Sequence, residues 1–522
     1  GVPMAVGQDD VSDGKGWLLE EVIVTAQKRE EKLIDVPISI AAIGEELIKD
    51  ADIQNMNDLS YIVPNLSIVE RSSGNQIISI RGIGNGIGSS PLVGIYLDEV
   101  PVSIVQGLTM DLQAIDLQRL EVLRGPQGTL FGQGSVGGTI RFISNGPSFD
   151  TYEGEIGVSA YNTKDGDWSK NLTAIANLPV IDNTLAFRVA AIYKDNGGWI
   201  DQPASNTEDA NDNELSNIRI KGLWQASDQL TVNLMALRYR NDAGSYSTTN
   251  VGSVTDSNYQ VVPVNGLDLP STDLTNDYDL YNLVLDYDLD FANLTSSSSK
   301  FDGKNTSSSS SLLLNLALPP ILNIPPETVF GAFEADLSKQ INGFSQEIRL
   351  SANSEALDWV VGVFYTDVDE DVESGTSGLY IDGSPFGPVS MGTKSTRSSE
   401  SVAFFGNLSY QISDQLVMAI GTRYFENEKT SKTLPFEIVS ENFYNLSSKV
   451  SLSYEMTDKA NLYFSISEGF RSGGFNFGSE TTYEPESVLS YEIGAKALLL
   501  DGRLSTDGAI FYSQYSDYQN NS

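Results

Sequence analysis

Beyond residue 150, apolar and polar residues alternate with a period of two. In TLAFRVAAIYK, Leu185 and Phe187 share one face, whereas Arg188 and Lys194 share the other. NLYFSIS, farther along the chain, alternates in the same way. Segments of about ten residues with one apolar and one polar face are typical of tilted strands that cross a lipid bilayer. The pattern therefore predicts an antiparallel membrane β-barrel.

The connections between these runs alternate in length. Tight turns, such as VIDN and QISDQ, are followed by longer polar loops, which is typical of outer-membrane barrels. We expect the long loops near 195–214, 241–276, 301–341, 370–397, 428–440 and 468–486. We expect about fifteen strands, near 153–162, 169–179, 183–194, 215–225, 228–240, 277–287, 291–300, 342–352, 358–369, 398–410, 415–427, 441–454, 459–467, 487–498 and 503–515.

Fifteen strands do not complete a barrel of the usual kind. Bacterial single-chain barrels have an even number of strands. The last predicted strand runs into DYQNNS, without a terminal aromatic residue to end a lipid-facing strand. We therefore expect the chain to be truncated at its C-terminus.

Before residue 150 the pattern is mixed. Short strand-like runs, namely QIISIRG, VGIYLDEVPV, LQRLEVLRG and GTIRFIS, are separated by many glycines. The segment 44–64 has apolar residues at mostly helical spacing and ends at Pro64. Those apolar residues are Leu47, Ile48, Ala51, Ile53 and Met56. We expect a small α+β domain over 31–150.

A lone strand-like run precedes this domain. Val22, Ile23, Val24 and Thr25 have high β-propensity but stand beside a charged cluster. Such a run fits a strand that adds to the sheet of a partner, or an isolated strand of a small sheet within the chain.

Gly132, Gly134 and Gly137 match the dinucleotide-binding pattern G-x-G-x-x-G. That pattern binds a pyrophosphate only where a helix begins on its glycines. Here the strand-like run TIRFIS follows instead. We therefore expect these glycines to serve turns and close packing.

Composition excludes several classes of function. The 32 basic and 70 acidic residues give a net charge of −38, which disfavours binding to nucleic acid. The chain has neither cysteine nor histidine, so metal sites and catalytic groups built on those residues are excluded. No nucleophile with an adjacent base is visible, and we expect neither an enzyme, a metal site nor a bound cofactor.

Several motifs resemble one family, the TonB-dependent outer-membrane receptors. These motifs are LEEVIVTAQKREEKLIDVPISI, IISIRGIG, GIYLDEVPV, LQRLEVLRGPQGTLFGQGSVGGTIRFIS, FSQEIRLSA, YFSISEGFRSGGFNFG and SYEIGAKALLLDGRLSTDGAIFYSQYSDYQ. The resemblance extends from about residue 19 to 518, although GQG stands where the family usually has GRN. It implies a 22-stranded barrel with an N-terminal plug in its lumen, of which about fifteen strands are present. The expected domains are a leader with the TonB box (1–30), the plug (31–150) and a partial transmembrane barrel (151–522).

The resemblance also implies a function and a location. Receptors of this family lie in the outer membrane of Gram-negative bacteria, in contact with its lipid, and import a scarce small-molecule nutrient or metal chelate. The TonB complex of the inner membrane supplies the energy by pairing with the TonB box, which here corresponds to Glu21, Val22, Ile23, Val24, Thr25 and Ala26. We expect a ferric siderophore because it is the commonest cargo, with iron present only as part of the chelate. Cobalamin, a carbohydrate or another bulky nutrient is the alternative, followed by a passive porin or a signal transducer.

Individual site residues follow from matching positions in the motifs. Plug arginines that pair with barrel glutamates correspond to Arg81 and Arg124 and to Glu347 and Glu492, although each could be a solvated charge of the lumen. The outward plug loops would contact the ligand through Asn85, Gly86, Ile87, Ser89, Ser90 and Gln106, or serve only as turns. The segment 296–326 fits either a lid over the site or a loop without ligand contact.

Overall fold

The computed structural model describes most of the chain. The described ranges are 22–72, 75–84, 90–103, 110–201, 208–244, 254–255, 261–262, 273–314, 330–381, 384–385, 391–433, 438–476, 481–500 and 502–519. Within these ranges, no helix combines the length and the apolar character that crossing a membrane requires.

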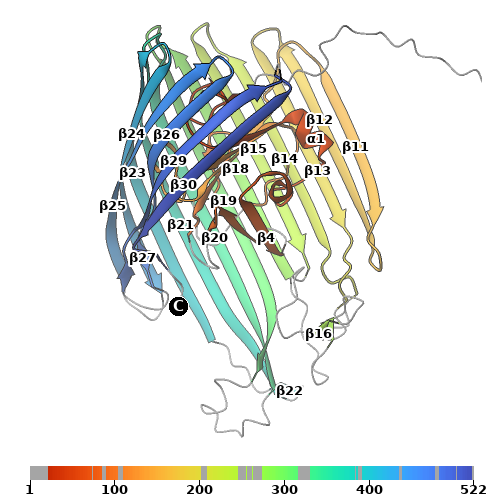
Figure 1. Ribbon diagram of the computed structural model, residues 1–522. Coiled ribbons are helices and arrows are strands. Elements are labelled where there is room, and N and C mark those ends of the chain that lie inside the picture. The colour runs from red at the N-terminus through yellow and green to blue at the C-terminus, as the bar shows by residue number, and fades with distance from the viewer. Residues whose placement is uncertain are drawn as a thin grey trace, which may run out of the picture.

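A curved wall of fifteen antiparallel strands dominates the molecule, each strand hydrogen-bonded to the next along the wall (Figure 1). The predicted number of about fifteen strands is therefore confirmed. The strands are β11 (Glu153–Asn162), β12 (Trp168–Ile181), β13 (Leu185–Asn196), β14 (Asn213–Gln225), β15 (Leu230–Ala243), β18 (Asp273–Asp288), β19 (Asn293–Leu314), β20 (Phe330–Ala352), β21 (Leu357–Ile381), β23 (Met391–Ser413), β24 (Leu416–Thr433), β25 (Ile438–Thr457), β26 (Ala460–Arg471), β29 (Glu486–Leu499) and β30 (Leu504–Ser516). Short strand pairs lie outside the wall or at its rim: β16 (Val254–Thr255) with β17 (Val261–Val262), β27 (Gly474–Phe475) with β28 (Thr482–Tyr483), and β22 (Ser384–Pro385) with β21.

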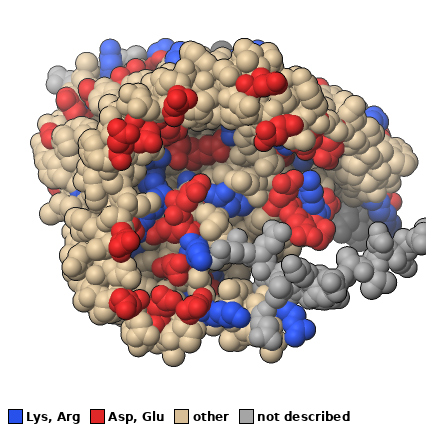
Figure 2. All heavy atoms as spheres, turned by 90° about the horizontal axis from the view of Figure 1, so that it is seen from above, with Lys and Arg blue, Asp and Glu red and all other residues tan. Residues whose placement is uncertain are grey.

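The alternation of residues decides which side of the wall faces the lumen. On β13, Arg188 and Lys194 are only 7% and 6% exposed, whereas Tyr193 on the other face is 41% exposed. Seen from the end with the short turns, charged side chains gather inside the curve of the wall, and uncharged residues make up most of its rim (Figure 2). This is the arrangement expected of a barrel whose outer face meets lipid.

Four strands are much longer than the sequence pattern predicts. β19, β20, β21 and β23 contain 22, 23, 25 and 23 residues. The expected loops at 301–341 and 370–397 are wrong over most of their length, because residues 301–314, 330–341, 370–381 and 391–397 continue these strands. About 9 to 11 residues suffice to cross the membrane. The remaining residues of these strands extend beyond the membrane, where strands of polar residues can pair through backbone hydrogen bonds without an apolar face.

The same finding corrects the lid expected at 296–326. Residues up to Leu314 belong to β19, which pairs with β18 on one side and β20 on the other. Residues 315–329 lie outside the described ranges.

The N-terminal domain is built on a five-stranded sheet in the order β3-β9-β10-β7-β8. Its members are β3 (Ile40–Gly44), β9 (Leu117–Arg124), β10 (Gly138–Ser144), β7 (Val93–Leu97) and β8 (Val100–Pro101). A second sheet joins β4 (Leu66–Ser72), β5 (Asn75–Ile80) and β6 (Ile83–Gly84). The helices are α1 (Glu45–Asp50), α2 (Leu59–Ile62) and α3 (Gly128–Phe131).

The segment 44–64, with its mostly helical spacing, does not form one continuous helix. The chain forms α1 and α2 with a turn between them, in which Asp52 has a φ of +49°. Ile48, Ile53 and Met56 are buried as their spacing predicts, but Leu47 is half exposed. An aspartate in the left-handed region interrupts the helix, because its short side chain tolerates this conformation better than most residues do.

The N-terminal domain is a plug that lies inside the curved wall (Figure 1). One hydrophobic cluster joins plug residues such as Leu120 and Phe142 to wall residues such as Leu237 and Tyr239. The plug therefore shares its core with the inner face of the barrel.

Candidate functional site

The glycine-rich loop between β9 and β10 rests directly on the barrel. Gly134 donates its backbone N–H to the carbonyl of Phe470 at 3.0 Å. A Cβ atom on Gly128 would lie 2.6 Å from the carbonyl oxygen of Glu468, closer than any real contact. The G-x-G-x-x-G pattern is followed by β10, not by a helix, so its glycines serve close packing and not a phosphate: a Cβ atom on Gly132 would meet Arg423 of β24, and one on Gly137 would meet Ile83 of the plug.

Two of the residues expected to join plug and barrel meet directly. Nη1 of Arg81 lies 2.6 Å from Oε2 of Glu492 on β29, and both side chains are more than nine-tenths buried. Glu492 also accepts hydrogen bonds from the hydroxyl of Tyr463 at 2.8 Å and from the backbone N–H of Ser39 at 3.1 Å. The Arg81 guanidinium lies 4.1 Å from the centre of the Phe511 ring. A second plug segment and three neighbouring strands thus converge on this ion pair.

The other two expected residues have partners that the sequence did not indicate. Arg124 lies 3.6 Å from Asp507 and not beside a glutamate within 4 Å in the described part of the chain. Glu347 lies 3.3 Å from the ammonium of Lys28 and 2.8 Å from Arg349, its neighbour on the same face of β20. The motif match identifies Arg124 and Glu347 as charged residues between plug and barrel, but their partners depend on how the plug lies in the barrel.

Two more ion pairs join the plug to the opposite part of the wall. Asp116 lies 2.7 Å from Arg188, and Asp98 lies 3.1 Å from Lys221. Burial alone would raise the pKa of Asp98, but the charges of Lys221 and Arg219 lower it. Burial would likewise raise the pKa of Asp116, but hydrogen bonds from Arg188 lower it. The sequence indicates neither pair, although the alternation along β13 places Arg188 on the polar face.

The segment that corresponds to the TonB box is folded onto its own chain. Glu21 lies outside the described residues, and Ile23–Val24 (β1) pairs antiparallel with Glu31–Lys32 (β2). Val24 and Ala26 are 0% and 1% exposed. In this structure the segment is a strand of a small sheet within the chain, and it is not added to the sheet of a partner.

Thr25 is held by a buried network of charges. Its backbone N–H donates to Oε1 of Glu121 at 2.9 Å, and its hydroxyl accepts from Arg141 at 2.8 Å and from Arg119 at 3.1 Å. Burial would raise the pKa of the Glu121 carboxyl, but the charge of Arg141 and the N–H of Thr25 lower it, as does Arg119. The carboxylate therefore stays ionised and keeps the segment docked.

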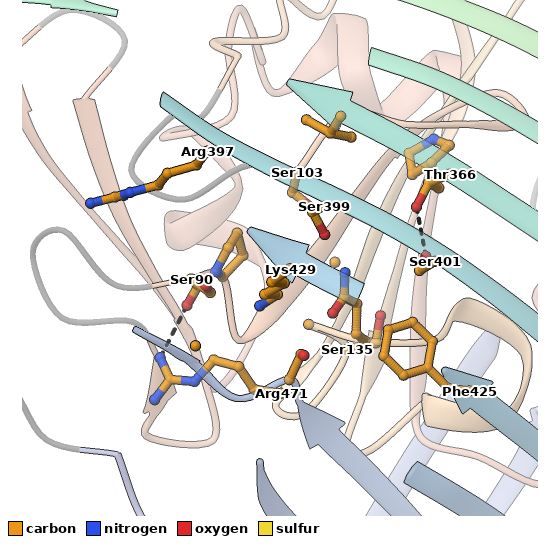
Figure 3. Close-up of a pocket in the computed structure, with 18 of the residues that line it drawn as sticks. Ser90, Ser103, Ser135, Thr366, Arg397, Ser399, Ser401, Phe425, Lys429 and Arg471 are labelled. Atoms are coloured by element: carbon orange, nitrogen blue, oxygen red, sulfur yellow. Dashed lines mark hydrogen bonds between the residues drawn. The ribbon is translucent and has the colours of Figure 1, made fainter. Parts of the chain in front are cut away.

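A cavity lies where the plug meets β21, β23, β24 and β26, toward the long-loop end (Figure 3). Its volume is about 140 Å³. The plug contributes Ser90, Ser103 and Ser135, and the barrel contributes Thr366 and Ser399, among others. Ser90 is the one expected ligand residue that the structure describes; Asn85, Gly86, Ile87, Ser89 and Gln106 lie outside the described residues.

Four cationic side chains line this cavity, against one carboxylate, that of Glu370. Arg471 donates to the carbonyl of Ser90 at 3.1 Å and pairs with Glu486 at 2.9 Å. The Arg397 guanidinium lies 4.0 Å from Glu370. The remaining two cations are those of Arg423 and Lys429.

Lys429 and Arg423 have no carboxylate within 4 Å among the residues that the structure describes. The Lys429 ammonium donates to the carbonyl of Gly473 at 2.6 Å. The Arg423 guanidinium lies between two rings, 5.3 Å from the centre of Phe364 and 5.4 Å from that of Phe405. A buried cation without a counter-ion is costly, and an anion at this position would offset that cost. The sequence does not indicate these residues, because only the fold brings them together.

Two family models match the chain. Residues 32–139 match the TonB-dependent Receptor Plug Domain, and residues 148–522 match the family described as TonB dependent receptor-like, beta-barrel. A pesticin receptor of Yersinia pestis is 24% identical over 528 residues, which cover 95% of this chain and 71% of that protein.

Solved structures share the fold. The ferric yersiniabactin uptake receptor from Yersinia pestis is 20% identical and has a TM-score of 0.76, over 92% of this chain and 73% of that one. The ferripyoverdine receptor of the outer membrane of Pseudomonas aeruginosa is 16% identical and has a TM-score of 0.75, over 95% of this chain and 65% of that one. The plug, the barrel wall and both family matches agree, and the chain belongs to the TonB-dependent receptors of the Gram-negative outer membrane.

Proposed function

We propose that this receptor imports an anionic metal chelate, a ferric siderophore with acidic groups, into the periplasm. The observation that carries the proposal is the cation-lined cavity between plug and barrel. In a chain with a net charge of −38, two buried cations there lack a carboxylate partner in the described structure. A cleft whose lining carries an excess of one sign of charge concentrates ligands of the opposite sign.

The size of the cavity limits what enters it. A volume of about 140 Å³ accepts one acidic group or one arm of a ligand. Pockets for whole drug-sized ligands measure about 300 to 1,000 Å³. The rest of the chelate would extend toward the long-loop end, from which it arrives.

Energy for import would come through the segment Glu21 to Ala26. Strand addition grips main-chain groups whatever the side chains are, which suits a segment that must transmit a pull. Val24 and Ala26 are buried in the described conformation, so the segment must leave the plug before a partner can pair with it.

The chelate proposal is tested with the receptor in outer-membrane vesicles and a panel of anionic and neutral ferric chelates. Lys429→Gln and Arg423→Gln each remove one unpaired cation, and Lys170→Gln removes an exposed lysine of β12 as the matched control. Hydrogen bonds to charged groups contribute about 1.5 to 3 kcal/mol. We expect each cavity variant to bind the anionic chelate about tenfold more weakly, with neutral chelates and the control unchanged. Equal affinity of the double variant and the parent would overturn the proposal.

Energy coupling is tested separately by deleting Glu21 to Ala26. We expect the deletion to abolish uptake and to leave chelate binding intact. Uptake at the parental rate would show that this segment does not transmit the energy.

A further inference from the structure

A second cavity lies on another part of the lumen wall. It opens between the plug and the long-loop ends of strands β11 to β15, with a volume of about 240 Å³. None of its lining residues also lines the cation-rich cavity. The family motifs of the plug and barrel do not account for the polar residues gathered here.

Lys194 is the most unusual of these residues. It is 6% exposed, lies on the lumen face of β13 and lines the cavity. Within the described structure no hydrogen bond or ion pair holds its ammonium group. Asp111 of the plug lines the same cavity but accepts hydrogen bonds from Gln76 and Gln113, at 3.3 and 2.8 Å. The negative charge of Asp111 acts on this ammonium group from beyond ion-pair distance, but no atom of the described structure accepts a hydrogen bond from it, so a ligand that accepts one is favoured.

Two further lining atoms are buried and have no hydrogen-bond partner among the described residues. They are Oε1 of Gln113, an acceptor, and Nδ2 of Asn211, a donor. Each such group costs about 1 to 3 kcal/mol when it stays unpaired. The cavity thus offers unsatisfied donors and an acceptor together. A hydroxyl group both donates and accepts, so a ligand with several hydroxyls can satisfy them all.

Aromatic side chains complete the lining. Trp199 is 37% exposed and Tyr161 is 46% exposed, and both line the cavity. The Oδ1 atom of Asn211 accepts the backbone N–H groups of Trp199 and Ile200, both at 2.8 Å, which fixes the position of the tryptophan. The flat apolar faces of these rings can pack against the C–H face of a sugar ring.

The charge of this cavity differs from that of the first. Its titratable lining groups are Lys194, Asp111, Asp212 and Tyr161. One cation against two carboxylates gives no preference for an anion, and a single lysine opposes binding of a cation. A neutral ligand meets the least electrostatic penalty.

We propose that this cavity binds one ring of a neutral, polyhydroxylated compound, a free saccharide, at a site separate from the cation-rich cavity. A volume of about 240 Å³ fits a single ring better than a chelate, because pockets for drug-sized ligands begin near about 300 Å³. The inference does not depend on the proposed import of a chelate, since it concerns equilibrium binding at other residues.

The test is calorimetric titration of the purified full-length receptor with glucose, galactose, mannose and N-acetylglucosamine. We expect saturable binding of at least one of them. We expect Lys194→Met and Trp199→Leu each to weaken that binding about tenfold, without changing the affinity for an anionic ferric chelate. Lys170→Met, on neighbouring β12 with an exposed side chain, is the matched control.

Three outcomes would overturn the inference: no saturable binding of any neutral sugar, binding unaffected by both cavity variants, or tighter binding of gluconate than of glucose. Purified lipopolysaccharide forms a second arm of the titration. If it binds in a Lys194-dependent manner while the free sugars do not, the ligand is a membrane glycan and the assignment to a free saccharide fails. Lys194→Met also removes the cation whose charge acts on the buried carboxylate of Asp111, so the double variant Lys194→Met/Asp111→Asn, which leaves no such carboxylate behind, is titrated beside it and should bind the sugar as weakly.

Discussion

Arg81 of the plug and Glu492 of the barrel form an ion pair of 2.6 Å in which the side chains are only 4% and 6% exposed. Glu492 also binds Tyr463 of β26, and Arg81 stacks on Phe511 of β30. The contact therefore fastens the plug to three successive strands of the wall at one point. A plug that must stay in place at rest and still move under force needs a few such defined attachments.

Replacing one member of this pair should weaken the attachment of the plug to the barrel wall. In Arg81→Met the Glu492 carboxylate remains buried without its cation, which costs about 3 to 5 kcal/mol in comparable pairs. We expect a lower free energy of plug unfolding, measured by guanidinium titration of the detergent-solubilised receptor. The double variant Arg81→Met/Glu492→Gln removes the charge and should recover most of the loss. If the single and double variants unfold alike, the buried charge is not the cause.

The contact between the glycine-rich loop and β26 leaves no room for a side chain. A Cβ atom on Gly128 would lie 2.6 Å from a backbone carbonyl of the barrel, whereas one on Gly146 would meet nothing within 4 Å. We expect Gly128→Ala to destabilise the plug by about 1 to 3 kcal/mol, the usual cost of overpacking. Gly146→Ala serves as the control in the same guanidinium titration and should match the parent. Equal midpoints for both variants would mean that the loop can move away from β26.

Most strands of the barrel could be predicted from the sequence because their signal is local. A strand in a membrane must alternate at every step, so Leu185 and Arg188 reveal their faces without knowledge of any neighbour. The alternation requirement ends at the membrane surface. The sequence therefore predicts loops for the upper parts of β19 and β21, where SSSSSLLL and EDVESG give no clear pattern.

The residues of the candidate sites, too, could be predicted only where their signal is local. The alternation of residues along β29 and β20 places Glu492 and Glu347 on the lumen face, but it does not predict which plug residue each one contacts. Arg124 therefore meets Asp507, and Glu347 meets Lys28, a residue from the leader. The cations of the first cavity come from three strands and become a cluster only when the wall curves.

The network around Thr25 should control how often the leader segment leaves the plug. Thr25→Val keeps the shape of the side chain but removes the hydroxyl that accepts from Arg119 and Arg141. Loss of hydrogen bonds to charged groups, at about 1.5 to 3 kcal/mol, should raise the open population about tenfold or more. Hydrogen exchange at the amides of Val24 and Ala26 measures this opening. Thr25→Ser retains the hydroxyl and should exchange at the parental rate; equally slow exchange in Thr25→Val would contradict the role of the hydroxyl.

Acid should loosen the plug on the β13–β14 side of the wall. The pKa values of Asp98 and Asp116 are lowered below their ordinary range, since the cations of Lys221, Arg188 and Arg219 offset the effect of burial.

A carboxyl whose pKa is lower in the folded state than in the unfolded state stabilises the fold at pH values above its unfolded pKa, about 3.9 for aspartate. That contribution is lost as the pH falls through the lower folded pKa. We therefore expect protease cleavage of the plug to stay constant from pH 7 to about pH 4 and to rise below it. The Asp98→Asn/Asp116→Asn variant should be cleaved faster at neutral pH and should show a weaker acid dependence. Glu121, whose pKa is also lowered, remains in that variant and accounts for the residual dependence. An acid profile identical to that of the parent would exclude these two aspartates as the groups that hold the plug.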